Sequence, residues 1–217
     1  MKSFVVIGCG RFGSTVATTL TELGNEVLAV DESYEKVNDI SDEVTTAVQC
    51  NIMDEGEVED LGLKNFDVAI VAIGSNIEAS IMATIMAKEA GIEYILCKAL
   101  TKRMGSILLK LGADNIIYPE RDMALRVAHN LTKKNILDYI QISPDFSLME
   151  TKPLPSWVGK SIEQLDIRNK YGVTIVAIER GKDVIVSPYA GELLKSDDVV
   201  VILGPDDKVK DLEEKND

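Results

Sequence analysis

The residues with the clearest chemistry lie near the start of the chain, where Gly8-Cys9-Gly10-Arg11-Phe12-Gly13 follows an apolar run and opens a helical pattern. In this GxGxxG arrangement the first glycine permits a tight turn, the second lets the backbone approach a phosphate, and the third lets helix and strand pack closely. The helix N-terminus adds unpaired N–H groups and the positive end of its dipole. The loop therefore predicts a phosphate-bearing nucleotide as ligand. Glycines present for packing alone are the alternative.

Two charged positions refine this predicted site. Asp31 ends the second apolar run, 23 residues after Gly8. A carboxylate there can bind both hydroxyls of an adenosine ribose and repel the 2′-phosphate of NADP; Glu32 beside it joins the candidate set. Arg11 favours ligands with extra phosphate, because a guanidinium binds phosphate through two parallel hydrogen bonds. A solvated arginine at a helix start is the alternative for Arg11.

Further ligand contacts are expected at the carboxyl ends of the other strands, because open parallel α/β sheets bind ligands there. The residues at these ends that we assign to the adenine and ribose are Asn51, Ile52, Ala72, Ile73, Gly74 and Lys98. Each of them could instead be an ordinary loop residue.

The elements that must position these residues are strands and helices in alternation, which is the pattern of a parallel sheet built from βα units. The segment 68–73 is continuously apolar, as expected of a strand buried on both faces. We expect a Rossmann-like doubly wound α/β sheet. Its six strands are predicted near 4–7, 27–30, 46–50, 68–73, 94–97 and 115–118, and a further helix is predicted over 120–134.

The pattern changes after residue 135, which we take as a domain boundary. Five of the six prolines follow it, and two β-rich runs flank Arg180-Gly181-Lys182-Asp183 as in a β-hairpin. A strand over 199–203 and a helix over 206–215 complete the pattern. Residues 1–135 are thus predicted to form the nucleotide-binding domain with its linking helix, and 136–217 a small α+β domain.

Composition excludes several function classes. The formal charge is −13. This charge argues against a nucleic-acid binder and against docking on or insertion into anionic lipid, because contact with nucleic acid or with anionic lipid needs a basic face. No stretch approaches the ~20 apolar residues of a transmembrane helix, and the first residues are unlike a secretory signal. Three cysteines without paired spacing argue against a disulfide framework and a CxxC metal site. We expect a soluble, cytosolic protein.

Catalytic groups are what the sequence lacks. The single histidine, His129, has no motif around it, and no nucleophile motif or paired catalytic carboxylates accompany the loop. The acidic run over 54–60 could chelate cations but fits the charged start of a helix better. We therefore predict a nucleotide sensor without enzymatic activity. An NAD-dependent oxidoreductase is the alternative function, and an NADH-linked redox sensor using Cys9 is a third.

Several longer motifs resemble a known family. The chain is similar to the Ktr/Trk potassium-uptake regulatory subunits at VIGCGRFGSTVA (6–17), LAVDESYEKV (28–37), NFDVAIVAIGSNIEAS (65–80), LGADNIIYPERDMALRVA (111–128) and LDIRNKYGVTIVAIERGKDVIVSP (165–188). The resemblance covers nearly the whole chain. It implies an N-terminal RCK domain, which regulates potassium conductance, and a C-terminal domain of the same regulatory module.

The resemblance also implies ligands and partners. Members bind ATP or ADP, some bind NAD or NADH, and ATP favours the active state whereas ADP favours the inactive one. Arg11 would then sense the γ-phosphate, and Glu120 would help to place a divalent or monovalent cation between paired ATP sites. Homodimers would assemble into an octameric ring on the cytoplasmic face of a membrane potassium-translocating subunit of the KtrB or TrkH type. An ordinary charge at a helix start is the alternative for Glu120.

A second effector implied by the resemblance is cyclic di-AMP, which can bind the C-terminal domain at its dimer interface and lower uptake. The residues that match this site are Ile167, Arg168, Thr174, Ile175 and Pro188. Arg168 could pair with a phosphate of this ligand. A surface arginine before a tight turn is the alternative.

Overall fold

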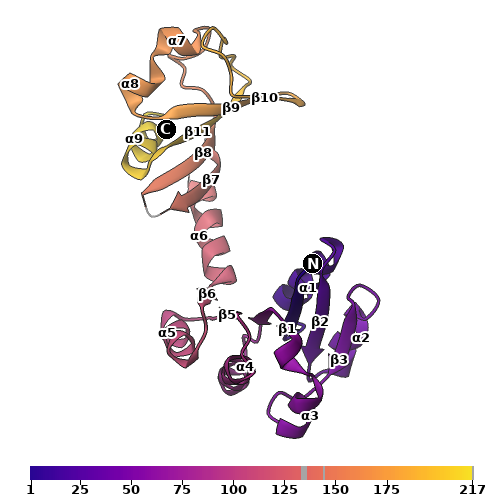
Figure 1. Cartoon of the computed structure of the whole chain (residues 1–217). Helices are drawn as coiled ribbons and strands as arrows, with labels where there is room; N and C mark the ends of the chain where they lie inside the picture. Colours follow the sequence, from indigo (N-terminus) through magenta and orange to yellow (C-terminus); the bar gives the residue numbers. More distant parts are fainter. Residues whose placement is uncertain (133–135, 144, 217) are drawn as a thin grey trace. The chain divides into compact units, whose positions relative to one another are not determined.

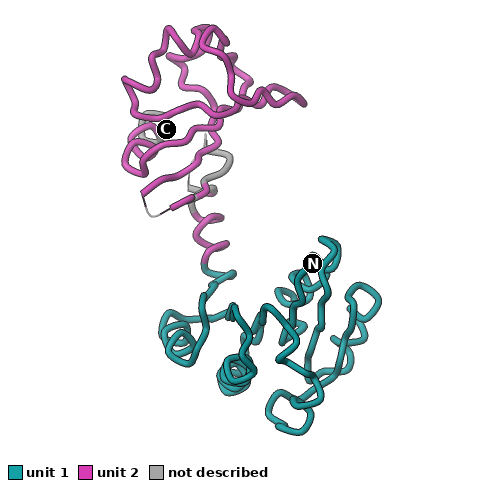
Figure 2. Tube along the Cα trace, viewed as in Figure 1, with its two compact units in different colours: residues 1–121 teal, residues 122–217 magenta. Residues whose placement is uncertain are grey.

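The chain forms two compact units, residues 1–121 and 122–217, in a computed structural model that describes residues 1–132, 136–143 and 145–216 (Figure 2). The division expected after residue 135 gives the linking helix to the first domain, whereas by its contacts most of that helix falls in the second unit. The boundary at residue 135 therefore stays a prediction about where the chain divides into folding domains.

The first unit contains a six-stranded parallel sheet with the order β3-β2-β1-β4-β5-β6 (Figure 1). Its strands are β1 (Ser3–Ile7), β2 (Glu26–Asp31), β3 (Thr46–Gln49), β4 (Val68–Val71), β5 (Tyr94–Lys98) and β6 (Asn115–Ile117). All six predicted strands are present, and the predicted Rossmann-like doubly wound sheet is confirmed. The strand order reverses between β1 and β4, which is where sheets of this kind bind ligands.

Helices cover both faces of this sheet. They are α1 (Arg11–Glu22), α2 (Tyr34–Ile40), α3 (Glu55–Asp60), the 3₁₀ turn η1 (Leu63–Asn65), α4 (Ile77–Glu89) and α5 (Lys102–Leu111). One face packs Val6 of β1 against Ala17 of α1 and Ile40 of α2. The other face packs Val5 against the α3–α5 side, where α4 and α5 lie next to each other (Figure 1). Strands buried on both faces explain the continuous apolar runs of the sequence.

Helix α6 (Pro119–Thr132) begins directly after β6, with proline at its first position, where the missing N–H costs nothing. The helix predicted over 120–134 is therefore present within the described residues. His129 belongs to it, but its side chain lies outside the described ones. Among the helices that the structure describes, none is long and apolar enough to cross a bilayer.

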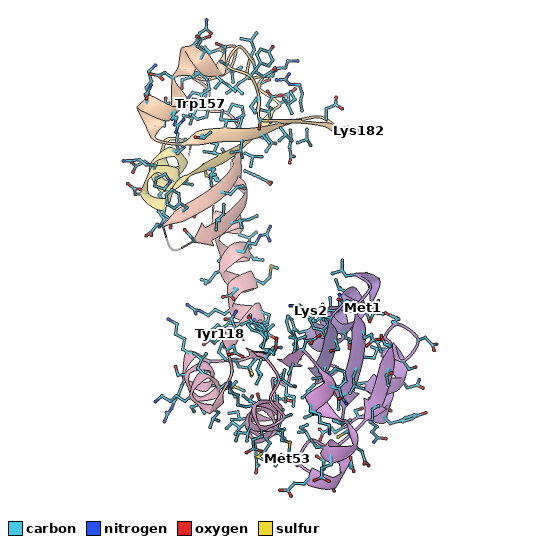
Figure 3. The ribbon with its side chains drawn as sticks, viewed as in Figure 1. Met1, Lys2, Met53, Tyr118, Trp157 and Lys182 are labelled. Carbon is cyan, nitrogen blue, oxygen red and sulfur yellow. The ribbon has the colours of Figure 1, made fainter. Side chains whose placement is uncertain are left out.

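The second unit contains a five-stranded antiparallel sheet with the order β10-β9-β11-β8-β7. Its elements are β7 (Ile136–Ser143), β8 (Phe146–Thr151), α7 (Ile162–Leu165), α8 (Ile167–Tyr171), β9 (Thr174–Arg180), β10 (Asp183–Val186), β11 (Val199–Pro205) and α9 (Asp206–Asn216). The predicted hairpin is β9–β10, and Lys182 lies at its tip (Figure 3). The final strand and helix are also present, which confirms the α+β class. Strands β7 and β8 and helices α7 and α8 were not predicted.

Two buried arrangements hold this unit together. The single tryptophan, Trp157, lies in this unit (Figure 3) and is 1% exposed. Its indole N–H donates to the Tyr171 hydroxyl at 3.2 Å. At the end of β9, the Arg180 guanidinium donates two hydrogen bonds to the buried carboxylate of Asp198, at 2.8 and 2.9 Å. It also binds Glu192 at 2.9 Å. Arg180 therefore ties the segment after the hairpin to β9.

Candidate functional site

The glycine-rich loop turns at the carboxyl end of β1, between β2 and β4. Gly8 has φ +107°, a conformation that side chains rarely adopt, and its N–H donates to the Val30 carbonyl at 2.7 Å. A Cβ at this position would lie 3.1 Å from the backbone of Ala72 and Ile73. The turn is therefore fixed from both neighbouring strands, as the glycine pattern predicts.

The two other glycines of the loop face different surroundings. A Cβ on Gly13 would lie 1.8 Å from the Gly8 carbonyl oxygen, whereas a Cβ on Gly10 would meet nothing within 4 Å. Gly13 thus allows α1 to pack on the loop, and Gly10 leaves open space in which a ligand can approach. Helix α1 begins here without a side-chain cap and without an acidic residue in its first turn. Its N-terminal dipole is thus available to a phosphate.

Asp31 connects the end of β2 to this loop. Its carboxylate is 7% exposed and accepts the backbone N–H of Cys9 at 2.8 Å and that of Ser33 at 2.9 Å. The Lys36 ammonium lies 3.2 Å from both carboxylate oxygens. A carboxylate has about four acceptor positions, and these four hydrogen bonds use them. A ribose hydroxyl would therefore have to replace the exposed Lys36 ammonium. With that exchange, the residues around the loop fit a nucleotide.

A cavity opens beside the loop and gathers most of the predicted contacts. The predicted residues that line it are Gly8, Gly10, Asp31, Glu32, Ile52, Ala72, Ile73 and Gly74. Sequence reasoning missed Lys36, Ser75 and Asn76, which also line it. Asn76 caps α4, since its side-chain oxygen accepts the Ala79 N–H at 3.1 Å. Polar residues directly before a helix, at the end of β4, are the signal that could have found Asn76.

Asn51 lies apart from this cavity. It lines a neighbouring hollow over β2 and β3, and its backbone N–H donates to the Glu57 carboxylate at 2.7 Å. Its side-chain oxygen accepts the Met53 N–H at 3.0 Å. The structure therefore places Asn51 beside the cavity at the glycine-rich loop rather than in its lining.

Lys98, Phe12 and Glu120 form a cluster at the ends of β5, the loop and α6. The Lys98 Nζ lies 2.5 Å from the Glu120 Oε1 and 5.7 Å from the centre of the Phe12 ring. Lys98 holds the pKa of the Glu120 carboxyl below its usual range, mainly by donating this hydrogen bond, and the charge of Arg11 acts in the same direction. Electrostatic contacts thus link four residues of the predicted set that lie outside the cavity lining: Arg11, Phe12, Lys98 and Glu120.

The expected cation beside Glu120 would have few side-chain ligands among the residues that the structure describes. Among the described residues, no three His, Cys, Asp or Glu side chains gather to hold a metal ion. Glu120 offers one carboxylate, which Lys98 already binds. In the acidic run, Asp54 caps α3 by accepting the N–H groups of Gly56 and Glu57 at 3.0 and 3.2 Å. The described residues therefore do not form a cation site by themselves.

The three cysteines are buried free thiols. Burial, followed by the nearby Asp31 charge, raises the pKa of Cys9 to about 12, and burial raises the pKa of Cys97 to about 11. A reactive thiol needs a low pKa and exposure. This environment disfavours the redox-sensor hypothesis for Cys9.

The predicted cyclic di-AMP residues differ in burial. Ile167 and Ile175 belong to the hydrophobic core of the second unit, whereas Arg168 and Thr174 are exposed and Pro188 is half-buried. Within a single chain, only the latter three are therefore accessible to a ligand. The role of all five stays a prediction.

Comparison with known proteins identifies both units. The TrkA-N domain model matches residues 4–119 and the TrkA-C domain model matches residues 149–216. The chain is 46% identical over 203 residues to the Ktr system potassium uptake protein C of Bacillus subtilis, covering 94% of this chain and 92% of that protein. It is 42% identical to the Ktr system potassium uptake protein A of the same organism, covering 98% and 96%.

Solved structures share the fold at low identity. The GsuK RCK domain superposes with a TM-score of 0.69 at 15% identity, over 99% of this chain and 47% of that chain, so this chain spans under half of its length. The TrkA-N domain of the inner membrane protein ybaL from Escherichia coli gives a TM-score of 0.53 at 19% identity, over 61% of this chain and 96% of that chain. The chain belongs to the family of TrkA-N and TrkA-C domain proteins that includes the Ktr system potassium uptake proteins.

Proposed function

We propose that this chain is the regulatory subunit of a potassium-uptake system, and that it senses adenine nucleotides through the site at the carboxyl end of β1. The observation that supports this most is the loop itself. Gly10 faces open space, α1 presents an uncapped N-terminus, and Asp31 at the end of β2 accepts a backbone N–H of the loop. The end of this strand is where a ribose-binding carboxylate is expected. The relatives named above as potassium uptake proteins match nearly the whole chain.

Discrimination between ATP and ADP is assigned to Arg11, the first residue of α1. A guanidinium beside the phosphates would form charge-assisted hydrogen bonds with the γ-phosphate of ATP, which ADP lacks, and would therefore favour ATP. NAD or NADH are further candidate ligands of the same cavity. A cation bridged by Glu120 would take further ligands from the nucleotide or from a second copy of the chain, since no three His, Cys, Asp or Glu side chains of the described residues gather to hold a metal ion.

Regulation rather than catalysis is the role that we assign. A ligand changes a partner only if it binds two conformations with different affinity. The partner in this proposal is a membrane potassium-translocating subunit, which a ring of homodimers contacts from the cytoplasmic side. Cyclic di-AMP is assigned to the second unit, with Arg168 as its phosphate contact. An NAD-dependent oxidoreductase is less well supported, because the sequence shows no catalytic motif beside the glycine-rich loop.

A flux experiment tests this function. The membrane subunit of the same organism is reconstituted in liposomes with and without this chain, and potassium flux is measured with ATP, ADP or no nucleotide. We expect the chain to bind the membrane subunit and ATP to give faster flux than ADP. A potassium flux that is the same with and without this chain, and the same with ATP, ADP or no nucleotide, would contradict the proposal.

A further inference from the structure

The ammonium of Lys98 lies between the nucleotide cavity and the first turn of α6. Its Nζ is 3.6 Å from the place that a Cβ on Gly74 would occupy, and Gly74 lines the cavity together with Gly8 and Gly10. On the other side it binds Glu120, the second residue of α6, at 2.5 Å. One cation therefore lies next to a residue that lines the cavity and also binds the start of the helix that leads into the second unit.

The two partners of this ion pair differ in burial. Lys98 is 9% exposed, whereas the Glu120 side chain is 61% exposed. A buried ammonium needs an anion, because leaving it without a partner is costly. An exposed carboxylate is solvated by water and gains little from a salt bridge. Glu120 can thus leave the pair at small cost, provided that Lys98 finds another anion.

Lys98 also has hydrogen-bonding capacity for a second anion. An ammonium offers three donors, and within the described part of the chain its Nζ makes one hydrogen bond, to Glu120. A nucleotide phosphate is an anion with several strong acceptor oxygens. A Cβ on Gly74 would be in van der Waals contact with the Lys98 ammonium, so the glycine leaves the path between the cavity lining and Lys98 free of a side chain.

We propose that Glu120 occupies Lys98 as an internal substitute for phosphate, and that a bound nucleotide phosphate takes Lys98 over and releases Glu120 from the first turn of α6. This inference rests on the proposed nucleotide site and names how that site acts on α6. Because Glu120 competes with the ligand, the affinity for phosphate-bearing nucleotides is lower than the site would otherwise give.

A double-mutant cycle on the full chain tests the exchange. ADP and adenosine are titrated by calorimetry into the wild type, Lys98→Met, Glu120→Gln and the double variant, with a chelator present so that no divalent cation bridges Glu120. Lys102→Met removes an equal charge from an exposed position at the start of α5 and is the control. Circular dichroism establishes that each variant is folded.

We expect Lys98→Met to weaken ADP binding by about tenfold or more, through the loss of a charge-assisted hydrogen bond, and to leave adenosine binding unchanged. Glu120→Gln is expected to tighten ADP binding by about threefold, because the internal competitor is neutralised. In the Lys98→Met background, Glu120→Gln should have no effect on ADP. The control variant should bind like the wild type.

Two results would overturn the exchange. Glu120→Gln could bind ADP no more tightly than the wild type, or Lys98→Met could weaken adenosine as much as ADP, which would indicate a structural role. In both cases the wild type still binds ADP, so the proposed function survives. Wild-type protein that binds no nucleotide would instead overturn the proposed function itself.

Discussion

The Asp31 carboxylate accepts the backbone N–H of Cys9 at 2.8 Å, so the end of β2 holds the glycine-rich loop in its turn. The side chain that would bind the ribose therefore also shapes the loop that would bind the phosphates. Its second oxygen accepts the Ser33 N–H, which extends the same arrangement to the start of α2. A substitution at Asp31 is therefore expected to change both the contact with the ribose and the structure of the loop.

Replacing Asp31 by Asn should weaken the binding of adenosine and of its phosphates alike. The amide group cannot accept from both Cys9 and Ser33, so one buried N–H loses its partner at a cost of about 1–3 kcal/mol. The ribose also loses an acceptor. Calorimetry with adenosine, AMP and ATP checks this, with Asp39→Asn on the exposed face of α2 as the control. Adenosine binding equal to that of the wild type would exclude the ribose role.

Gly13→Ala should lower the stability of the first unit, whereas Gly10→Ala should weaken nucleotide binding. A Cβ at Gly13 would overlap the Gly8 carbonyl oxygen, so Gly13→Ala should lower the free energy of unfolding by more than about 2 kcal/mol. A Cβ at Gly10 meets open space, and Gly10→Ala should keep the stability within about 0.5 kcal/mol while weakening nucleotide binding. Urea denaturation and calorimetry on both variants measure this. Equal stability losses would mean that a Cβ at Gly10 does not enter open space, and nucleotide binding by Gly10→Ala equal to that of the wild type would mean that this space has no role in binding.

Alkaline pH should destabilise the first unit partly through Cys9. Its pKa rises from an ordinary value near 9 to about 12 in the folded chain because the thiol is buried. The folded state therefore keeps a proton that the unfolded chain releases. This contribution is complete below pH 9 and is lost as the pH rises from 9 toward 12, by about 1.4 kcal/mol per pH unit.

The matched comparison for this effect is Cys9→Ala. Urea unfolding followed by far-ultraviolet circular dichroism should show the stability difference between wild type and variant shrinking from pH 8 to pH 11. A difference that stays constant over this range would show that Cys9 ionises alike in the folded and unfolded chain.

Arg180→Met should destabilise the second unit, because the buried Asp198 carboxylate would lose its cation. Breaking a buried ion pair costs roughly 3 kcal/mol or more. The variant Arg180→Met with Asp198→Asn should recover part of this loss, since no charge is then left alone. Fluorescence of Trp157 reports the unfolding of this unit selectively, because it is the single tryptophan of the chain.

The same pair predicts an acid response. Arg180 holds the pKa of the Asp198 carboxyl below its usual range, first through their hydrogen bonds. The stability that this gives is present above the unfolded pKa of about 3.9 and is lost as the pH falls below it. Asp198→Asn should therefore be less sensitive to acid than the wild type. Identical acid unfolding curves would contradict the assignment.

Most of the first unit could be predicted from sequence because its strands are buried on both faces. Val68–Val71 is apolar throughout, so its burial is visible without knowledge of its neighbours. Strand β8 gave no such signal, since its inward side chains are Ser147, Met149 and Thr151. Ser147 is buried because its hydroxyl binds Asp206 at the start of α9. A strand is predicted from apolar and polar residues that alternate along the sequence. A buried polar residue whose hydrogen-bond partner is distant in the sequence breaks this alternation, so the strand is not recognised.

The site divides in a similar way. Gly8, Gly10 and Asp31 could be predicted because the turn and the ribose position fix their spacing. The pairing of Lys98 with Glu120 joins residues 22 apart on separate elements, and the tie from Asp31 to Cys9 depends on the register of β1 and β2. Such contacts come from tertiary packing, which no local pattern contains.

Calorimetric titration of ATP and of ADP into the wild type and into Arg11→Ala tests most directly whether this chain distinguishes the two nucleotides through Arg11. We expect the wild type to bind both nucleotides in the micromolar range and to distinguish them, and we expect Arg11→Ala to remain folded and to lose the distinction. Wild-type protein that binds neither nucleotide, or an Arg11→Ala variant that still separates ATP from ADP as well as the wild type does, would contradict this expectation.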